Sequence, residues 1–144
     1  MITKVFLDTN VLLDCIVKGR SHAAASMKVL DLVRGHNIEA VVTTQSVIDM
    51  AYVDRNSPNH EAFNNFISWM IGHINVEQLD SFDIKEAIIA DGADFEDEAQ
   101  VAHAISSACH YFITSDKGLL KKDIPGMEII SPESFIDRLI CKEK

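Results

Sequence analysis

Several residue types are scarce in this chain of 144 residues, and each scarcity excludes a class of protein. The 3 cysteines (Cys15, Cys109 and Cys141) show no CxxC spacing, which argues against a disulfide scaffold and favours reduced, buried thiols. The 6 glycines and 3 prolines exclude collagen-like and low-complexity chains. No apolar run approaches the roughly 20 residues of a membrane span, and Asp8 interrupts the segment that a signal peptide would need. We therefore expect one cytoplasmic domain over residues 1–144, without membrane contact.

Positive charge is also scarce. Lysine and arginine number 13 against 22 acidic residues, which gives a net charge of −9 and opposes broad, non-specific attraction to nucleic acid. Residues 91–98 hold five acidic side chains and no basic one. A segment this acidic is either a solvated surface or a place where cations bind.

Short apolar segments alternate with amphipathic ones along the whole chain. We expect strands near residues 4–7, 40–43, 74–79, 111–114 and 127–130. We expect helices near 11–18, 22–35, 60–73 and 82–90, one after the second strand, one ending near 110 and one from 132 onward. Such alternation predicts a three-layer α/β/α domain around a mostly parallel sheet of four to five strands.

Four aspartates follow the expected strands or open the helices beside them. Asp8 directly follows the first strand, and Asp116 follows the fourth by two residues. Asp49 lies about a turn and a half beyond the second strand, and Asp97 opens the helix that precedes the fourth. Because ligands bind beyond the carboxyl ends of parallel strands, we expect these four carboxylates to converge on one edge of the sheet.

Converging carboxylates repel one another unless a cation neutralises them. Oxygen ligands without clustered histidine or cysteine select Mg²⁺ or Mn²⁺ over zinc. Such an ion polarises a phosphoryl oxygen and lowers the pKa of a bound water, so the implied chemistry is hydrolysis of a phosphodiester.

The residues of this edge resemble those of a known family. The string VFLDTNVLLD at residues 5–14 looks like the opening of a PIN domain, the metal-dependent nuclease fold of VapC-type toxins. The strings DFEDEAQVA at 94–102 and YFITSD at 111–116 are similar to the third and fourth motifs of that family. The resemblance extends over about residues 3 to 131, with the motifs in order.

This resemblance assigns roles to individual residues. It implies that Asp8, Asp97 and Asp116 hold Mg²⁺ or Mn²⁺, and that Asn10 orients the first aspartate or the substrate. Asp49 stands where the family usually carries glutamate, one methylene longer, and would complete the acidic pocket. Asp94 shares a helix face with Asp97 and is an alternative or additional ligand.

The resemblance also implies an activity and partners. It implies a metal-dependent endoribonuclease that acts on RNA, is the toxin of a toxin–antitoxin pair, forms a homodimer and is blocked by an antitoxin protein. Lys117, Lys121 and Lys122 follow the fourth carboxylate and are candidates for contacts with RNA phosphates.

Simpler roles exist for each acid. Asp8 is also a suitable helix cap, Asp116 a turn residue, Asp49 a surface carboxylate, and the acids near Asp97 favourable at a helix N-terminus. The shortened Asp49 motivates a second hypothesis, a catalytically degenerate relative that binds RNA or protein without cleaving. A phosphoryl-acceptor receiver domain and a haloacid-dehalogenase-type phosphatase fit less well, since the first would need paired acids and the second an aspartate in place of Asn10.

Overall fold

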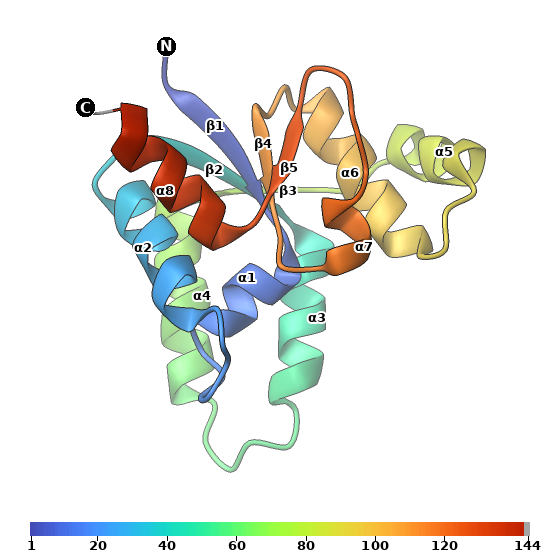
Figure 1. Cartoon of the computed structure of the whole chain (residues 1–144). Coiled ribbons are helices and arrows are strands. Elements are labelled where there is room, and N and C mark those ends of the chain that lie inside the picture. Colours follow the sequence, from blue (N-terminus) through green and yellow to red (C-terminus); the bar gives the residue numbers. More distant parts are fainter. Residues whose placement is uncertain (143–144) are drawn as a thin grey trace.

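Within residues 1–142, which the computed structural model describes, five parallel strands form one central sheet (Figure 1). Their order across the sheet is β3-β2-β1-β4-β5. The strands are β1 (Thr3–Leu7), β2 (Ile38–Thr43), β3 (Asn75–Glu77), β4 (Tyr111–Ile113) and β5 (Glu128–Ile130). All four strand pairs are parallel, so their carboxyl ends lie at one edge of the sheet.

Helices fill the connections between these strands and cover both faces of the sheet. They are α1 (Thr9–Asp14), α2 (Ala23–Arg34), α3 (Thr44–Asp54), α4 (Glu61–His73), α5 (Ser81–Ala90), α6 (Phe95–Ser106), α7 (Lys117–Leu120) and α8 (Pro132–Lys142). In the part of the chain that is described, no helix is both long and apolar enough to cross a membrane. The expected α/β/α architecture is confirmed.

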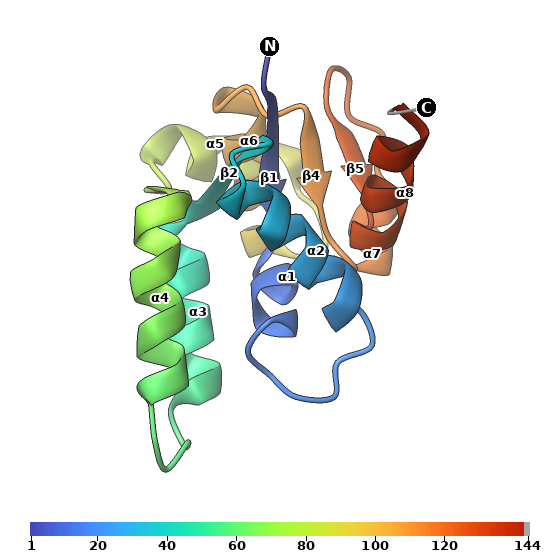
Figure 2. The same cartoon turned by 90° about the vertical axis from the view of Figure 1, so that its left-hand side faces the viewer.

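Alternating side chains of the central strand separate two apolar cores. Val5 and Leu7 of β1 are fully buried on the face covered mainly by α1, α2, α4 and α8. Phe6 points to the other face, where it stacks on Phe112 of β4 with ring centroids 4.8 Å apart and packs beneath α6 and α7. In Figure 2, α2 and α8 lie in front of the sheet and α6 lies behind it. The sheet is thus buried on both faces, as its continuous apolar strands predict.

Two helix pairs extend from this sheet. Helices α3 and α4 contact each other, and both project beyond the carboxyl edge in the two views (Figures 1 and 2). On the other side, α5 packs against α6, which leads into β4. The region beyond the carboxyl edge is therefore bordered by the first turns of α1, α3, α6 and α7.

Several local expectations are corrected by the structure. The first helix ends at Asp14 rather than near residue 18, and α6 begins after Asp94, so Asp97 lies inside its first turn. The sequence offers Thr44 or Ser46 as the cap of α3, but the cap is Thr43, whose hydroxyl oxygen accepts a hydrogen bond from the backbone N–H of Ser46. The cysteines are free, but only Cys109 is buried; Cys15 is half-buried and Cys141 exposed.

The buried face of α3 also differs from the expected one. Helical spacing in the sequence predicts that Val47, Ile48, Ala51 and Tyr52 face inward, but Ile48 and Tyr52 are 63% and 64% exposed. Met50 is fully buried instead. Helical periodicity identifies an apolar stripe, but the α3–α4 pair projects beyond the sheet, so part of that stripe meets solvent.

Candidate functional site

Asp8 lies at the carboxyl end of the central strand and is 6% exposed. Its Oδ1 accepts a hydrogen bond from the backbone N–H of Thr9 at 2.8 Å, which caps α1. Its Oδ2 accepts from the Thr114 hydroxyl at 2.8 Å and from the Asn10 amide at 3.3 Å. Asp8 is thus a helix cap, which is the structural role expected for it from the sequence. The same hydrogen bonds hold both of its carboxylate oxygens in place at the carboxyl edge of the sheet.

The neighbouring strand end supplies Asp116. Its Oδ1 accepts a hydrogen bond from the backbone N–H of Leu119 at 3.0 Å and caps α7. Its own N–H donates to the Thr114 hydroxyl oxygen at 3.0 Å, and the same hydroxyl donates to Asp8. Asn10 also lies here, because its Oδ1 accepts from the Ser115 backbone N–H at 3.4 Å. The hydroxyl of Thr114 therefore joins the two carboxylate-bearing turns.

The first turn of α6 brings Asp94 and Asp97 to the same region. Asp94 caps the helix, since its Oδ1 accepts from the Asp97 backbone N–H at 3.0 Å. Burial, which is the largest cause, and the nearby charges of Asp116 and Asp94 raise the pKa of Asp8. Burial first, and then the charges of Asp8, Asp94 and Asp116, raise the pKa of Asp97 to about 7. Four of the carboxylates singled out in the sequence therefore share one electrostatic environment.

A hollow of about 420 Å³ opens beside these acids. Asp94, Asp97 and Asp116 line it together with Lys121 and Lys122, which follow α7. Lys122 Nζ lies 2.5 Å from Oε1 of Glu98, a buried residue of α6. The hollow therefore combines a carboxylate wall with a basic rim.

Asp49 occupies a different position from the other predicted acids. It lies on α3, where its Oδ1 accepts from the Gln45 side-chain amide at 2.9 Å. It also shares a hydrogen bond with Glu96 of α6, and this contact, followed by burial, raises the pKa of Glu96 to about 8. The groups that most raise the pKa of Asp97 do not include Asp49. The structure therefore links Asp49 to the site through Glu96, a residue with no individual role among the sequence-based expectations.

Buried hydroxyl groups and the side-chain amide of Gln100 form hydrogen bonds between the segments that carry the carboxylates. Gln100 of α6 is 1% exposed; its Oε1 accepts from the Thr43 hydroxyl at 2.9 Å and its Nε2 donates to Ser46 Oγ at 3.0 Å. The Ser46 and Thr9 hydroxyl oxygens are 2.8 Å apart. These polar groups tie α6 to the start of α1 beside Asp8. Only the position of Gln100 three residues after Asp97, on the same helix face, indicated such a role in the sequence.

A protein-family model matches residues 4–118, and its family is described as the PIN domain. This match extends from the central strand to the turn that carries Asp116. The chain belongs to the PIN-domain family. A comparison with curated protein sequences finds no match.

Solved structures support this PIN-domain fold at low sequence identity. VapBC2 from Rickettsia felis, bound to a promoter DNA fragment, has a TM-score of 0.64 at 13% identity, covering 90% of this chain and 98% of that one. A toxin–antitoxin complex from Klebsiella pneumoniae gives 0.66 at 14%, with 89% and 97% covered. VapC20 from Mycobacterium tuberculosis, described as a toxin that cleaves the sarcin–ricin loop, gives 0.63 at 12%, with 78% and 90% covered.

The donor set of this PIN domain suits a hard divalent cation. Among the described residues 1–142, no three acidic, histidine or cysteine side chains are arranged as a closed ion site. Mg²⁺ is usually held by one or two carboxylates and keeps several waters, so it does not require such a cage. After burial, which is the largest cause, the charges of neighbouring carboxylates contribute to the raised pKa of both Asp8 and Asp97, so negative charge is crowded here. A cation beside these carboxylates would offset that repulsion.

Proposed function

We propose that this PIN domain is a metal-dependent endoribonuclease and the toxin of a toxin–antitoxin pair. The observation that carries the proposal is the convergence of Asp8, Asp94, Asp97 and Asp116, from three separate segments, at the carboxyl edge of the sheet. A helix-capping role explains Asp8, Asp94 and Asp116 singly, and a first-turn position explains Asp97, but neither role requires that these acids lie close enough to raise one another's pKa. Similar solved structures, one described as a toxin–antitoxin complex and one as a toxin that cleaves the sarcin–ricin loop, support the same activity.

In this proposal Asp8, Asp97 and Asp116 hold Mg²⁺ or Mn²⁺, and Asp94 is an additional candidate ligand. When bound, the cation would polarise the phosphodiester and activate a water for hydrolysis. The Thr114 hydroxyl and the Asn10 amide orient Asp8 by donating to its Oδ2. With Oδ2 held by these two donors and Oδ1 by the backbone N–H of Thr9, the Asp8 carboxylate keeps one orientation.

The basic rim would hold the substrate. Lys121 and Lys122 line the hollow, and in this proposal they bind phosphates on either side of the scissile bond. The net charge of −9 opposes long-range attraction of RNA, so we expect modest affinity that falls with salt. A protein antitoxin with basic side chains would complement this surface better than RNA does. We further propose that the protein is a cytoplasmic homodimer.

The direct test is cleavage of a mixed RNA pool with Mn²⁺ by the wild-type protein and by Asp8→Asn. We expect cleavage by the wild-type protein alone, since an amide removes one negative oxygen from the centre of the cluster. EDTA should abolish it. Equal cleavage by both proteins would indicate a contaminating nuclease and contradict the proposal.

The second candidate is a PIN domain that binds RNA without cleaving it, and the position of Asp49 favours it. Asp49 contacts Glu96, and it is not among the groups that most raise the pKa of Asp97, so its carboxylate stands apart from the main cluster. RNA binding in a gel-shift assay without Mn²⁺-dependent cleavage would support this alternative. Gain of cleavage in Asp49→Glu would show that the shorter side chain is the reason.

A further inference from the structure

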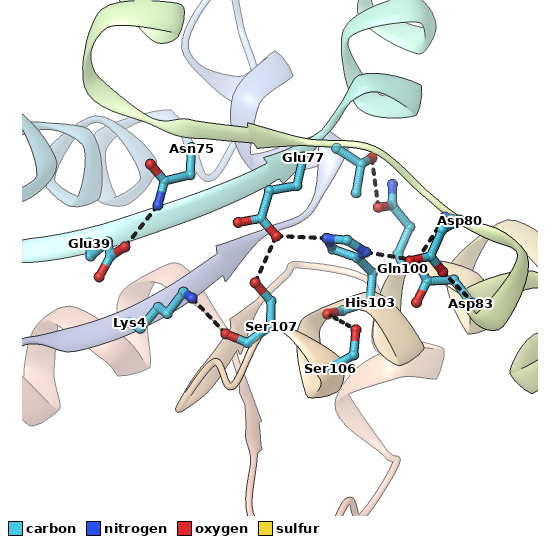
Figure 3. Close-up of polar contacts among 11 residues, drawn as sticks. Lys4, Glu39, Asn75, Glu77, Asp80, Asp83, Gln100, His103, Ser106 and Ser107 are labelled. Carbon is cyan, nitrogen blue, oxygen red and sulfur yellow. Dashed lines mark hydrogen bonds and ion pairs between the residues drawn. The ribbon is translucent and has the colours of Figure 1, made fainter.

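His103 is an ionisable side chain enclosed by three elements of the fold. It lies on α6 and is 7% exposed. Its Nδ1 is 2.7 Å from Oδ2 of Asp83 on α5, and its Nε2 is 2.8 Å from Oε1 of Glu77 at the end of β3 (Figure 3). One side chain thus joins α6 to both of the elements that precede it.

The partners of His103 determine its charge. Both ring nitrogens face carboxylate oxygens, and only the imidazolium carries an N–H on each nitrogen. Burial by itself lowers the pKa of His103, but hydrogen bonds and charge from Asp83 and Glu77 outweigh burial and raise it. The contact is therefore a positive histidine between two carboxylates at pH 6.5 and below.

Asp83 depends on this charge because it is fully buried. Its Oδ2 also accepts from the backbone N–H of Asp80, which completes the capping box of α5. Its Oδ1 is buried without a hydrogen-bond partner within the described residues. Without a positive His103, an unpaired carboxylate would remain inside the protein, and removing one partner of a buried ion pair is strongly destabilising.

The Glu77 side of the contact is partly solvated and has further partners. Oε1 of Glu77 accepts from the Ser107 hydroxyl at 2.7 Å. Lys4 of β1 attracts Glu77 and donates to the Ser107 carbonyl oxygen at 2.6 Å (Figure 3). Burial by itself raises the pKa of Glu77, but the hydrogen bonds from Ser107 and His103 outweigh burial and lower it. Glu77 is therefore ionised at neutral pH. His103 thus contacts side chains of β3 and α5 directly, and Lys4 of β1 acts on it indirectly, through Glu77 and Ser107.

The same helix carries the carboxylates of the candidate site. His103 is six residues after Asp97, which is about 9 Å along a helix at 1.5 Å per residue. Gln100 lies between them and bonds to Ser46 Oγ. A helix restrained at these two levels has little freedom to rotate or slide, so the restraint at His103 also fixes the direction of Asp97.

We propose that charged His103 is a positioning residue, which holds α6 against β3 and α5 so that Asp97 faces Asp8 and Asp116. The inference rests on the proposed nuclease activity for what Asp97 does. The restraint on α6 itself is a property of the fold and is measurable without RNA.

Hydrogen exchange of His103→Gln at pH 6.5 tests the restraint. We expect the amides of residues 98–102 to exchange roughly tenfold faster than in the wild-type protein, because loosening α6 lowers its local opening free energy. Val33→Ala removes buried methyl groups from α2 and serves as a control that destabilises a remote core. It should lower the melting temperature without selectively deprotecting 98–102. Unchanged exchange in His103→Gln, or equal deprotection in both variants, would overturn the proposal.

A second variant separates charge from packing. Adding Asp83→Asn to His103→Gln removes the stranded carboxylate, so protection at 98–102 should recover toward wild type. The recovery would not occur if the imidazole acted only by its shape. This double variant also remains informative if the single variant does not fold.

Kinetics connect the restraint to the reaction. His103→Gln should lower kcat for RNA cleavage roughly 10- to 100-fold with little change in KM, because misplacement of a reacting group weakens the chemical step. The double variant should regain part of kcat. If wild-type protein does not cleave RNA, the proposed function fails while the exchange result stands. If His103→Gln cleaves with wild-type kcat, the positioning role fails and the nuclease function stands.

Discussion

Replacing Asp97 with asparagine should stabilise the metal-free protein at pH 7. Burial and the charges of Asp8, Asp94 and Asp116 raise the pKa of Asp97 from 3.8 to about 7. At about 1.4 kcal/mol per pKa unit this corresponds to about 4 kcal/mol of opposition to ionisation. The side chain is half-exposed and its first-turn position favours negative charge, so we expect solvent screening and the helix dipole to leave about 1–2 kcal/mol.

The same pKa gives the sign of the pH dependence. The folded protein keeps a proton on Asp97 up to about pH 7, whereas the unfolded chain releases it near 3.8. The contribution of Asp97 to the free energy of unfolding is therefore highest below pH 3.8, and it falls as the pH rises from 3.8 to about 7. The asparagine variant lacks this loss, so the difference between the two proteins should shrink toward zero at pH 4.

Thermal melting in EDTA at pH 4, 5.5 and 7 measures this effect. For a chain of this length, 1–2 kcal/mol corresponds to a rise of roughly 2–8 °C at pH 7. Asp137→Asn, at an exposed aspartate of α8, is the matched control and should not change the melting temperature. With Mn²⁺ the order should reverse, since only the wild-type site gains stability from the ion. A lower melting temperature for Asp97→Asn at pH 7 in EDTA, or a difference independent of pH, would refute the reasoning.

Three further predictions concern the supports of the site. The stability that His103 contributes, measured as wild type minus His103→Gln by urea unfolding, should be present below pH 6.5 and disappear as pH rises through the raised pKa of His103; a constant difference would contradict the charged pair. Gln100→Ala leaves two buried hydroxyls without their partner and should cost about 1–3 kcal/mol in the same assay, whereas a loss near zero would mean that water replaces the amide. In Gly92→Ala the new Cβ would lie 2.3 Å from Oε1 of Glu98, so Glu98 must leave its lysine partner; we expect a loss of about 1 kcal/mol, and an unchanged melting temperature would show that Glu98 moves freely.

The strand-end aspartates were predictable because their positions depend on neighbours in the sequence. Asp8 and Asp116 each follow a short apolar strand and cap the helix that begins next, with hydrogen bonds that reach one to three residues ahead. Ser131 and Pro132 start α8 in the same way, since the Ser131 hydroxyl oxygen accepts from the Ser134 N–H. Apolar runs alternating with helices also determine a parallel sheet, whose carboxyl ends share one edge.

The partners across that edge were not predictable from the sequence. Asp49 and Glu96 are far apart in the chain, and whether they meet depends on the angle at which α3 and α6 leave the sheet. The histidines of the sequence show no metal-ligand spacing, which predicts a surface or partly buried position for His103, yet α5 and β3 enclose it. The exposure of Ile48 was unpredictable for the same reason. The direction in which α3 leaves the sheet decides which of its apolar side chains pack against another element.

The sequence by itself determined the order of the elements, the layered fold and the aspartates at the strand ends, because each follows from bonds and periodicities within a few residues. Only the tertiary structure decided how strongly those carboxylates interact, that Glu96 shares a hydrogen bond with Asp49, and that His103 lies between two acidic side chains. Contacts of this kind depend on the packing of whole helices on the sheet, which is set by the shape of both cores together.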